Sequence, residues 1–419
     1  MVHNRIIAAT DAGTKPPAFY VPVRMNPKIL PKEQRQYAAF FLNLLHWKWC
    51  CWQAEADGFI RLKQEYILRV IPQEIFHPIR RRLVGRGIVE FDATWVPDTR
   101  CQGYRLADAY RKTKRIVCRN KELAERIQKL YTAERGPCLP VHRWLESKLD
   151  LLTFDWERAQ EVIAKMQPDD DSSLAVEEYR QAVAEACQRL AHADHWFHCD
   201  DYGRCHTPVT NLPKELRCCL SVDGQPLVNL DLANSQPLMA GIVAAEYYGS
   251  KRKAARLLAR RFGGKNPYCG RTPQTAATQK PDLANYLKVC EEGRLYESLM
   301  LPGEERERFK REFFGMMYGK KRRRGSRLEV AYPAVAEMLA RLKRRDYRHA
   351  AHLMQNVEAT LFIHCVCGRL MQEEPTMPVY TIHDSVLTTP EYVGTARKAI
   401  REVFGRLGLQ PTIREEECK

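Results

Sequence analysis

The chain of 419 residues has no apolar stretch of the length, about 18 residues, that a membrane-spanning helix requires. Its first residues, MVHNRIIAATDAG, also lack the apolar segment of a secretory signal peptide. No internal repeat or extended low-complexity segment is present, which argues against a repeat architecture. We therefore expect a cytoplasmic protein that has no membrane partner.

Cysteine is plentiful but dispersed. The 15 cysteines form no Cys-x-x-Cys zinc pattern, and they are too scattered in a chain of this length for a disulfide framework. The pair closest to a zinc pattern, Cys365 and Cys367, is better explained by an apolar helix face. These features favour a reducing compartment. We expect buried or partly buried thiols at the adjacent cysteines: Cys50, Cys51, Cys218 and Cys219.

Acidic side chains are outnumbered by basic ones. The chain has 67 Lys and Arg against 51 Asp and Glu, for a net charge of +16. Basic residues cluster in KRKAARLLARR (Lys251 to Arg261) and in KKRRR (Lys320 to Arg324). This distribution predicts a polyanionic partner whose binding weakens steeply with salt. A generally basic soluble protein is the alternative.

The first 115 residues predict an arm followed by a small domain. Residues 1–35 are rich in proline and polar residues, and a helical pattern follows from Gln34 to about Trp52. Pro72 to Val84 predicts a helix, Ile88 to Trp95 a strand, and Gly103 to Leu106 a returning strand. This outline is winged-helix-like. Its arginines suit contact with DNA, and the domain could equally bind a replication partner or be purely structural: Arg80, Arg81, Arg82, Arg86 and Arg100.

The rest of the chain divides near residue 200. The pattern from Lys121 to His195 is mostly helical, and a polar stretch that starts at Pro168 predicts a solvated loop. After Tyr202 strands and helices mix. We therefore expect a helical region at 116–199 and an α+β region at 200–419.

A stripe of four residues recurs in RERFKREFFGMMYG, which runs from Arg306 to Gly319. Arg306, Lys310, Phe314 and Tyr318 are four residues apart, so on a helix they form one line about 18 Å long. Two cations followed by two aromatic rings suit a nucleoside triphosphate, with the cations at phosphates and the rings at base and sugar. An amphipathic helix with an aromatic core end is the alternative.

Two aspartates are predicted at strand ends. Asp231 lies in the apolar strand LVNLDL (Leu227 to Leu232), and Asn234 or Ser235 could cap the helix that follows. Asp384 lies with His383 at the tip of a predicted hairpin, VYTIHDSVLTT. Taken singly, each is explained equally well as a turn aspartate.

Taken together, the two aspartates and the cationic stripe favour nucleotidyl transfer. Asp231 and Asp384 are 153 positions apart (384 − 231), so only the fold could unite them. Phosphoryl chemistry on a polyanion needs charge compensation more than covalent catalysis. We expect the two carboxylates to ligate two Mg²⁺ ions, with Mn²⁺ as an alternative.

These motifs resemble the polymerase domain of the family A DNA polymerases, whose palm fold is shared with single-subunit phage-type RNA polymerases. The fingers-helix pattern of that family is Arg, three residues, Lys, three residues, Phe or Tyr, Gly, two residues, and Tyr-Gly. Arg306 to Gly319 matches this pattern without a gap. The metal motifs match at Asp231, in DLANSQPL, and at His383 and Asp384. The resemblance covers residues 200–419.

The resemblance implies a role for each matching residue. Asp231 and Asp384 would be catalytic and would ligate the metal ions. The incoming dNTP would contact the nucleotide-binding set: Arg306, Lys310, Phe314, Tyr318 and Gln236. The DNA primer–template would contact the nucleic-acid-binding set: Arg204, Gln355 and His383. A surface cation and a helix-capping amide are equal alternatives for Arg204 and Gln355.

Two departures leave the choice of sugar open. The DNA polymerases usually have a glutamate five residues after the first aspartate, where it excludes a ribose 2′-hydroxyl, and this chain has Gln236. Ser385, which follows Asp384, resembles the RNA polymerases instead. Phe314 resembles the DNA enzymes.

The resemblance implies an α+β, right-hand polymerase with an antiparallel-sheet palm and helical fingers inserted at about 251–330. A thumb-like helical region at 116–199 and the winged-helix-like domain at 1–115 would precede it. The expected activity is primer extension with dNTPs by a compact polymerase without an exonuclease domain, in a bacterial or phage-infected cell. The alternatives are an RNA polymerase or primase, and a non-catalytic DNA-binding replication protein.

Overall fold

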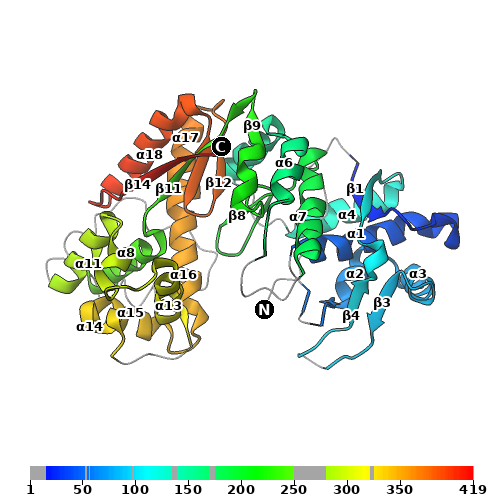
Figure 1. Cartoon of the computed structure of the whole chain (residues 1–419), viewed down its shortest axis with the longest axis horizontal. Helices are drawn as coiled ribbons and strands as arrows, with labels where there is room; N and C mark the ends of the chain where they lie inside the picture. Colours follow the sequence, from blue (N-terminus) through cyan, green and yellow to red (C-terminus); the bar gives the residue numbers. More distant parts are fainter. Residues whose placement is uncertain are drawn as a thin grey trace. The chain divides into compact units, whose positions relative to one another are not determined.

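The computed structural model describes residues 16–51, 54–55, 57–96, 99–134, 139–168, 175–249, 280–320 and 325–418. The protein is α+β, and its helices accompany several small antiparallel sheets (Figure 1). Among the helices in these ranges, none is both long enough and apolar enough to span a membrane. The strongly basic segment at 251–261 lies outside the described residues, as do most of KKRRR and the loop predicted just after Pro168.

The chain forms two compact units. The first contains the described residues of Met1–Pro137, Leu152–His198 and Asn211–Leu220, and the second those of Cys138–Leu151, Cys199–Thr210 and Ser221–Lys419. The region predicted at 116–199 is therefore not separate. Most of it joins the N-terminal residues, because α7 (Val176–Ala191) packs on α1 (Arg35–Cys50).

The first unit is mainly helical, with short strands. Besides α1 and α7 its elements are β1 (Ala18–Pro22), β2 (Ile60–Arg61), α2 (Gln64–Val70), α3 (Gln73–Gly85), β3 (Val89–Asp92), β4 (Gly103–Leu106), β5 (Thr113–Val117), α4 (Lys121–Glu134), β6 (Thr153–Phe154) and α6 (Trp156–Ile163).

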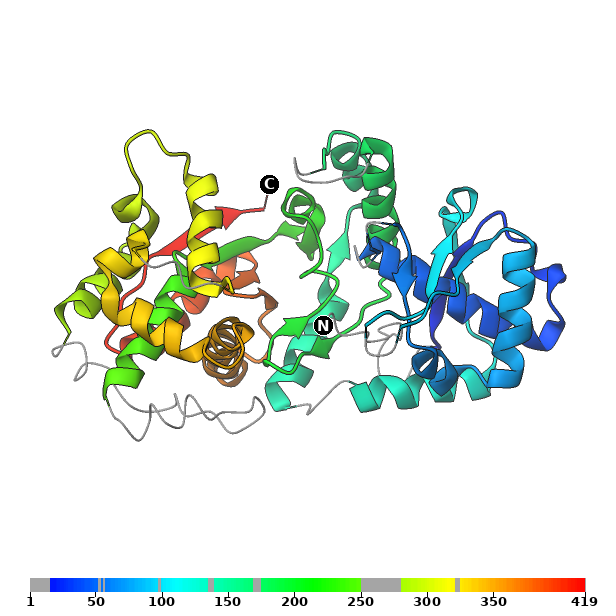
Figure 2. The same cartoon turned by 90° about the horizontal axis from the view of Figure 1, so that it is seen from below.

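The core of this unit surrounds α1. Every residue of α1 from Tyr37 to Cys50 is buried, as expected for a helix that is apolar on all sides. β1 pairs with β5 and packs on α1 (Figures 1 and 2). All five residues of β1 are buried, so the prediction of an arm over residues 1–35 is wrong for Ala18–Pro22. Residues 1–15 of that arm lie outside the described residues.

The helices and strands predicted between residues 34 and 106 are confirmed. The predicted helices are α1 and α3, and the predicted strands are β3 and β4, which pair with each other. β2 adds to β4, which gives a sheet in the order β2-β4-β3.

The second unit contains the remaining elements. They are α5 (Pro140–Lys148), β8 (Cys205–His206), β10 (Gln225–Pro226), β11 (Val228–Leu232), α8 (Ser235–Gly249), α11 (Pro281–Glu291), α12 (Leu295–Leu299), α13 (Arg306–Tyr318), α14 (Arg327–Ala331), α15 (Pro333–Leu342), α16 (Arg348–Ala359), the π-helix η6 (Thr360–Cys367), α17 (Gly368–Glu373), β12 (Tyr380–Ile382), β13 (Ser385–Thr388), α18 (Val393–Gly405) and β14 (Ile413–Glu417). β7 (His198–Cys199) and β9 (Leu220–Val222) lie where the chain passes between the units.

An antiparallel sheet organises this second unit. Its strand order is β12-β13-β11-β14, so strands from two distant parts of the sequence meet at its centre. β11, β12 and β13 are almost entirely buried, and α18 packs against β11 and β13. α8 leaves the end of β11 and packs against α11, α15 and α16 (Figure 1). The sheet therefore presents the end of β11 to a helical layer.

The junction between β11 and α8 differs from the prediction in one respect. Asn234 has a left-handed backbone, with φ of 53°, and is buried. Neither polar atom of its side-chain amide has a hydrogen-bond partner among the described residues, so Asn234 does not cap α8. The helix begins at Ser235 with Pro237 in its first turn, where the missing amide hydrogen costs little.

Candidate active site

Strand pairing brings Asp231 and Asp384 together. β11 and β13 are antiparallel neighbours in register Asp231 to Ser385, and Asp384 directly precedes Ser385. Asp384 and His383 form the two-residue turn between β12 and β13, with Ile382 paired to Ser385. His383 takes the positive φ of 53° that such tight hairpin turns require. Two carboxylates that are 153 positions apart (384 − 231) are thus adjacent in the fold.

The fold disfavours the ionised form of both carboxylates. Burial raises the pKa of Asp231 to about 6, and the charge of Asp384 adds to this rise. Burial likewise raises the pKa of Asp384. The ammonium group of Lys310 lowers the pKa of both aspartates, so α13 presents a cation to the pair.

Two further residues, neither of them a predicted site residue, face the pair. Arg414 on β14 lies opposite Asp231 in the sheet register and lowers its pKa. The side chain of Ser235, at the start of α8, lowers the pKa of Asp384. The local sequence marked Ser235 only as a possible helix cap and did not mark Arg414, because both contacts depend on the pairing and direction of neighbouring elements.

Helix α13 carries a buried face and, beside it, the predicted stripe. Its buried residues are Phe309, Phe313, Met316 and Met317. The stripe residues are only partly buried and run along the edge of this buried face: Arg306, Lys310, Phe314 and Tyr318. The ring of Phe314 also contacts that of buried Phe313, with centroids 6.4 Å apart, so the alternative of an amphipathic helix with an aromatic core end stays open.

The two cations of the stripe have acidic neighbours. Nε of Arg306 donates to Oε1 of Glu297 at 2.7 Å, and its guanidinium lies over the ring of Tyr296. Nζ of Lys310 is 3.7 Å from Oε2 of Glu307. The side chain of Lys310 is 40% exposed and that of Arg306 is 33% exposed, so both retain access to solvent.

The two rings of the stripe stack on each other, and one of them begins a series of hydrogen-bonded polar side chains. Phe314 and Tyr318 are stacked, with centroids 5.9 Å apart. The Tyr318 hydroxyl donates to Oε1 of Gln236 at 2.7 Å, and Nε2 of Gln236 donates to Glu358. Glu358 also accepts from Nε of Arg204 at 3.0 Å and from its Nη2 at 2.5 Å. Gln236 is therefore held from both ends of its amide.

Glu358 is the principal residue that the sequence analysis missed. Its carboxyl group is buried, and this burial raises its pKa to about 7 despite the charge of Arg204. A signal existed, since Glu358 is the only charged residue in the otherwise uncharged stretch LMQNVEATLF. A charge in such a context needs a buried partner. Arg204, predicted to contact nucleic acid, is that partner in this structure.

The remaining predicted residues border the site. Gln355 is partly buried on α16, one turn before Glu358. His383 is exposed at the hairpin tip, and its ring centroid is 6.4 Å from that of His206. Nε2 of His206 is in turn 3.0 Å from Oδ2 of Asp200. The second unit thus gathers the predicted site residues around α13, α16 and the β12–β13 turn.

The aspartate pair fits a divalent cation. Asp231 and Asp384 offer oxygen donors, which Mg²⁺ prefers, and burial raises the pKa of both. A bound dication would favour the ionised form of both. These two residues are therefore the candidate metal ligands, next to the cationic side of α13.

The arginines of the first unit are mostly engaged within it. The Arg80 guanidinium lies over the Phe91 ring, Arg82 donates to the Ile29 carbonyl at 3.1 Å, and Arg100 pairs with Asp57. Arg81 and Arg86 are exposed on and just after α3. A nucleic-acid contact at this helix would depend on those two residues.

No protein-family model matches the chain, and no curated protein is similar to it in sequence.

Proposed function

We propose that the protein is a template-directed nucleotidyltransferase and, most specifically, a DNA polymerase that extends a primer 3′-hydroxyl with dNTPs. The observation that carries the proposal is the adjacent pair Asp231 and Asp384, which shares the cation of Lys310. Transfer of a nucleotidyl group from a dNTP to a 3′-hydroxyl, with release of pyrophosphate, needs charge compensation that a metal-binding carboxylate pair and a cationic helix would supply.

Each part of the site has a task in this chemistry. Asp231 and Asp384 would hold two Mg²⁺ ions, which when bound supply Lewis-acid activation of the hydroxyl and neutralise phosphate charge. Lys310 and Arg306, which lie along α13, would contact the triphosphate. Phe314 and Tyr318 present stacked rings for the base, at the end of the same helix.

The glycine at position 315 is an argument for a ligand that binds beside α13. A glycine inside a helix costs about 1 kcal/mol relative to alanine. No packing explains it, since a Cβ at Gly315 would meet no heavy atom within 4 Å among the described residues. Open space next to Phe314 is what a bound nucleotide would need.

The fixed side chain of Gln236 is an argument for dNTPs as the substrate rather than NTPs. Its amide is fixed between Tyr318 and Glu358, so it cannot swing away without breaking two hydrogen bonds. A bulky, fixed group at this position would meet a ribose 2′-hydroxyl. In this proposal the second unit supplies palm and fingers, and the first unit, with exposed Arg81 and Arg86, binds template DNA or a replication partner.

Primer extension tests the proposal. The full chain is assayed with Mg²⁺ and either dNTPs or NTPs on a primed DNA template, beside Asp231→Asn, Asp384→Asn and the control Asp223→Asn, an exposed turn residue. We expect dNTP-dependent extension that each site variant abolishes, while DNA binding by fluorescence anisotropy persists and the control stays active. Unchanged extension in either site variant would overturn the proposal, and preferred use of NTPs would point to an RNA polymerase or primase.

A further inference from the structure

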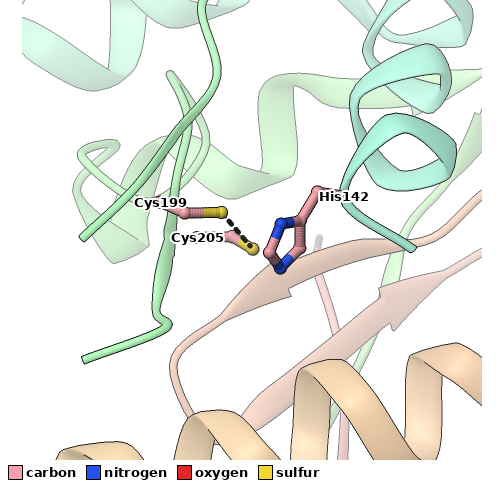
Figure 3. A group of neighbouring side chains, drawn as sticks. All are labelled: His142, Cys199 and Cys205. Carbon is pink, nitrogen blue, oxygen red and sulfur yellow. Dashed lines mark hydrogen bonds between the residues drawn. The ribbon is translucent and has the colours of Figure 1, made fainter. Parts of the chain in front are cut away.

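Three potential metal ligands converge in the second unit, at a place that the proposed reaction does not use. His142 lies on α5, Cys199 at the end of β7 and Cys205 at the start of β8. One imidazole nitrogen and two sulfurs all lie within 4.8 Å of one another, and all three residues are buried. Figure 3 shows the three side chains pointing toward one another from these separate elements.

The sulfur geometry fits a tetrahedral metal ion. The Sγ atoms of Cys199 and Cys205 are 3.7 Å apart. Two sulfurs bound to tetrahedral Zn²⁺ at about 2.3 Å lie about 3.8 Å from each other. A disulfide would place them about 2.05 Å apart, so the two thiols are separate.

The backbone holds the two cysteines in place. Between them, the Asp200 amide donates to the Arg204 carbonyl at 3.0 Å, and the Gly203 amide donates to the Asp200 carbonyl at 3.1 Å. Gly203 has φ of 87°, which allows this tight turn. The turn returns Cys205 next to Cys199, although five residues separate them in the sequence.

The chemistry of the donors agrees with this geometry. Two sulfurs and one imidazole nitrogen are donor types that Zn²⁺ binds in proteins. The ring of His364, on η6, is 5.6 Å from that of His142 and lies beside the cluster. Cys₂His sets with a fourth position for water are a known type of zinc site.

We propose that His142, Cys199 and Cys205 bind one Zn²⁺ ion, with the fourth coordination position filled by water. The site does not have the Cys-x-x-Cys spacing by which zinc ligands are recognised in a sequence. Cys199 and Cys205 are spaced Cys-x₅-Cys, and His142 lies 57 positions upstream (199 − 142). Only the fold brings that histidine to the hairpin.

The ion would fix the base of a hairpin that reaches the candidate active site. The tip of that hairpin is already held on α16. The Tyr202 ring stacks on His352 at 4.4 Å, and Nδ2 of Asn356 donates to the Tyr202 carbonyl at 3.2 Å. Arg204, beside the second cysteine, pairs with Glu358. Zinc binding itself does not depend on the proposed activity; only this positioning role does.

Metal analysis of the full chain tests the site. The protein is purified under reducing conditions without a metal-affinity step, and its metal content is measured by plasma mass spectrometry. We expect about one zinc per chain. The double variant Cys199→Ser/Cys205→Ser should lose it. The double variant Cys218→Ser/Cys219→Ser should keep it, which makes it a matched control because its two sulfurs are also close, at 3.8 Å.

Two measurements on the wild-type chain keep the test independent of variant folding. Replacement of zinc by Co²⁺ should give a thiolate charge-transfer band and the intense visible bands of a tetrahedral site. Peptide mapping should find Cys199 and Cys205 as free thiols after the metal is removed. A folded wild-type chain without metal, or one that links these two cysteines in a disulfide, would overturn the proposal, as would unchanged zinc in the Cys199/Cys205 variant.

Discussion

Neutralising Asp231 should stabilise the protein while removing its proposed activity. The change is Asp231→Asn, which keeps the shape of the side chain and removes its charge. In the folded chain the pKa of Asp231 is raised from 3.8 to about 6. The ionised carboxylate is therefore disfavoured in the folded state relative to the unfolded state, and its removal relieves that cost.

The size of the effect follows from the pKa shift. A rise of about two units corresponds to about 3 kcal/mol, at 1.36 kcal/mol per unit. Because Asp231 is only partly buried, solvent screening reduces this free energy. We therefore expect Asp231→Asn to raise the free energy of unfolding by about 2 kcal/mol. The free-energy cost of the ionised Asp231 carboxylate has its full size above the folded pKa of about 6. It shrinks as the pH falls through that value toward 3.8, because the folded wild type becomes protonated.

Urea denaturation with chelator present measures the effect. The free energy of unfolding of wild type and Asp231→Asn is compared at about pH 8 and about pH 4.5 by circular dichroism. Hydrogen exchange of peptides from β11 and β13 assigns the transition to the second unit, since two units need not unfold together. The variant should be more stable at the higher pH, with a smaller difference at the lower pH.

Asp223→Asn is the matched control. Asp223 is an exposed aspartate in the turn between β9 and β10, so its replacement should change stability by less than about 0.5 kcal/mol. A variant at Asp231 that is no more stable than wild type at about pH 8, or whose gain does not depend on pH, would refute the reasoning.

Two further predictions concern the cations around the pair. Arg204→Met should lower the free energy of unfolding by about 2–3 kcal/mol above pH 7, because it leaves the carboxylate of Glu358 buried without its partner. The loss should be smaller near pH 5, where Glu358, with a pKa of about 7, is protonated in the wild type as well. Lys310→Met removes the cation that lowers the pKa of Asp231 and Asp384. It should raise the KM for dNTP about tenfold or more in primer extension, the value of one lost charged contact.

Each of these variants has a control on a nearby helix. Arg341→Met removes an exposed arginine that pairs with Glu337 along α15, and it should cost less than about 0.5 kcal/mol. Lys288→Met removes an exposed lysine on α11 and should leave the KM for dNTP unchanged. Equal losses for Arg204→Met and Arg341→Met would show that the Arg204 pair has no special energetic weight. A normal KM in Lys310→Met would remove Lys310 from the proposed nucleotide site.

Local patterns were sufficient for much of the second unit. An apolar run predicted β11, a turn signal between two β-branched runs predicted the hairpin with His383 and Asp384, and a four-residue period predicted α13. These features depend on residues that are close in sequence, where backbone preference and alternating burial decide the outcome. The first unit shows the limit. Ala18–Pro22 contains the strand-favouring run Phe19, Tyr20 and Val21 between prolines, but its partner β5 lies about ninety residues later, where no local pattern indicates the pairing.

The sequence by itself determined which chemical groups this protein has and on which kinds of element they lie: aspartates at strand ends, cations and rings along one helix, and a large excess of positive charge. Only the tertiary structure decided which of them meet. It paired β11 with β13 and so joined Asp231 to Asp384, gave Glu358 its partner Arg204, and brought His142 to two cysteines. The physical reason is that hydrogen-bond ladders and helix packing set distances between residues far apart in the chain, and those distances set both the pKa values and the candidate metal ligands.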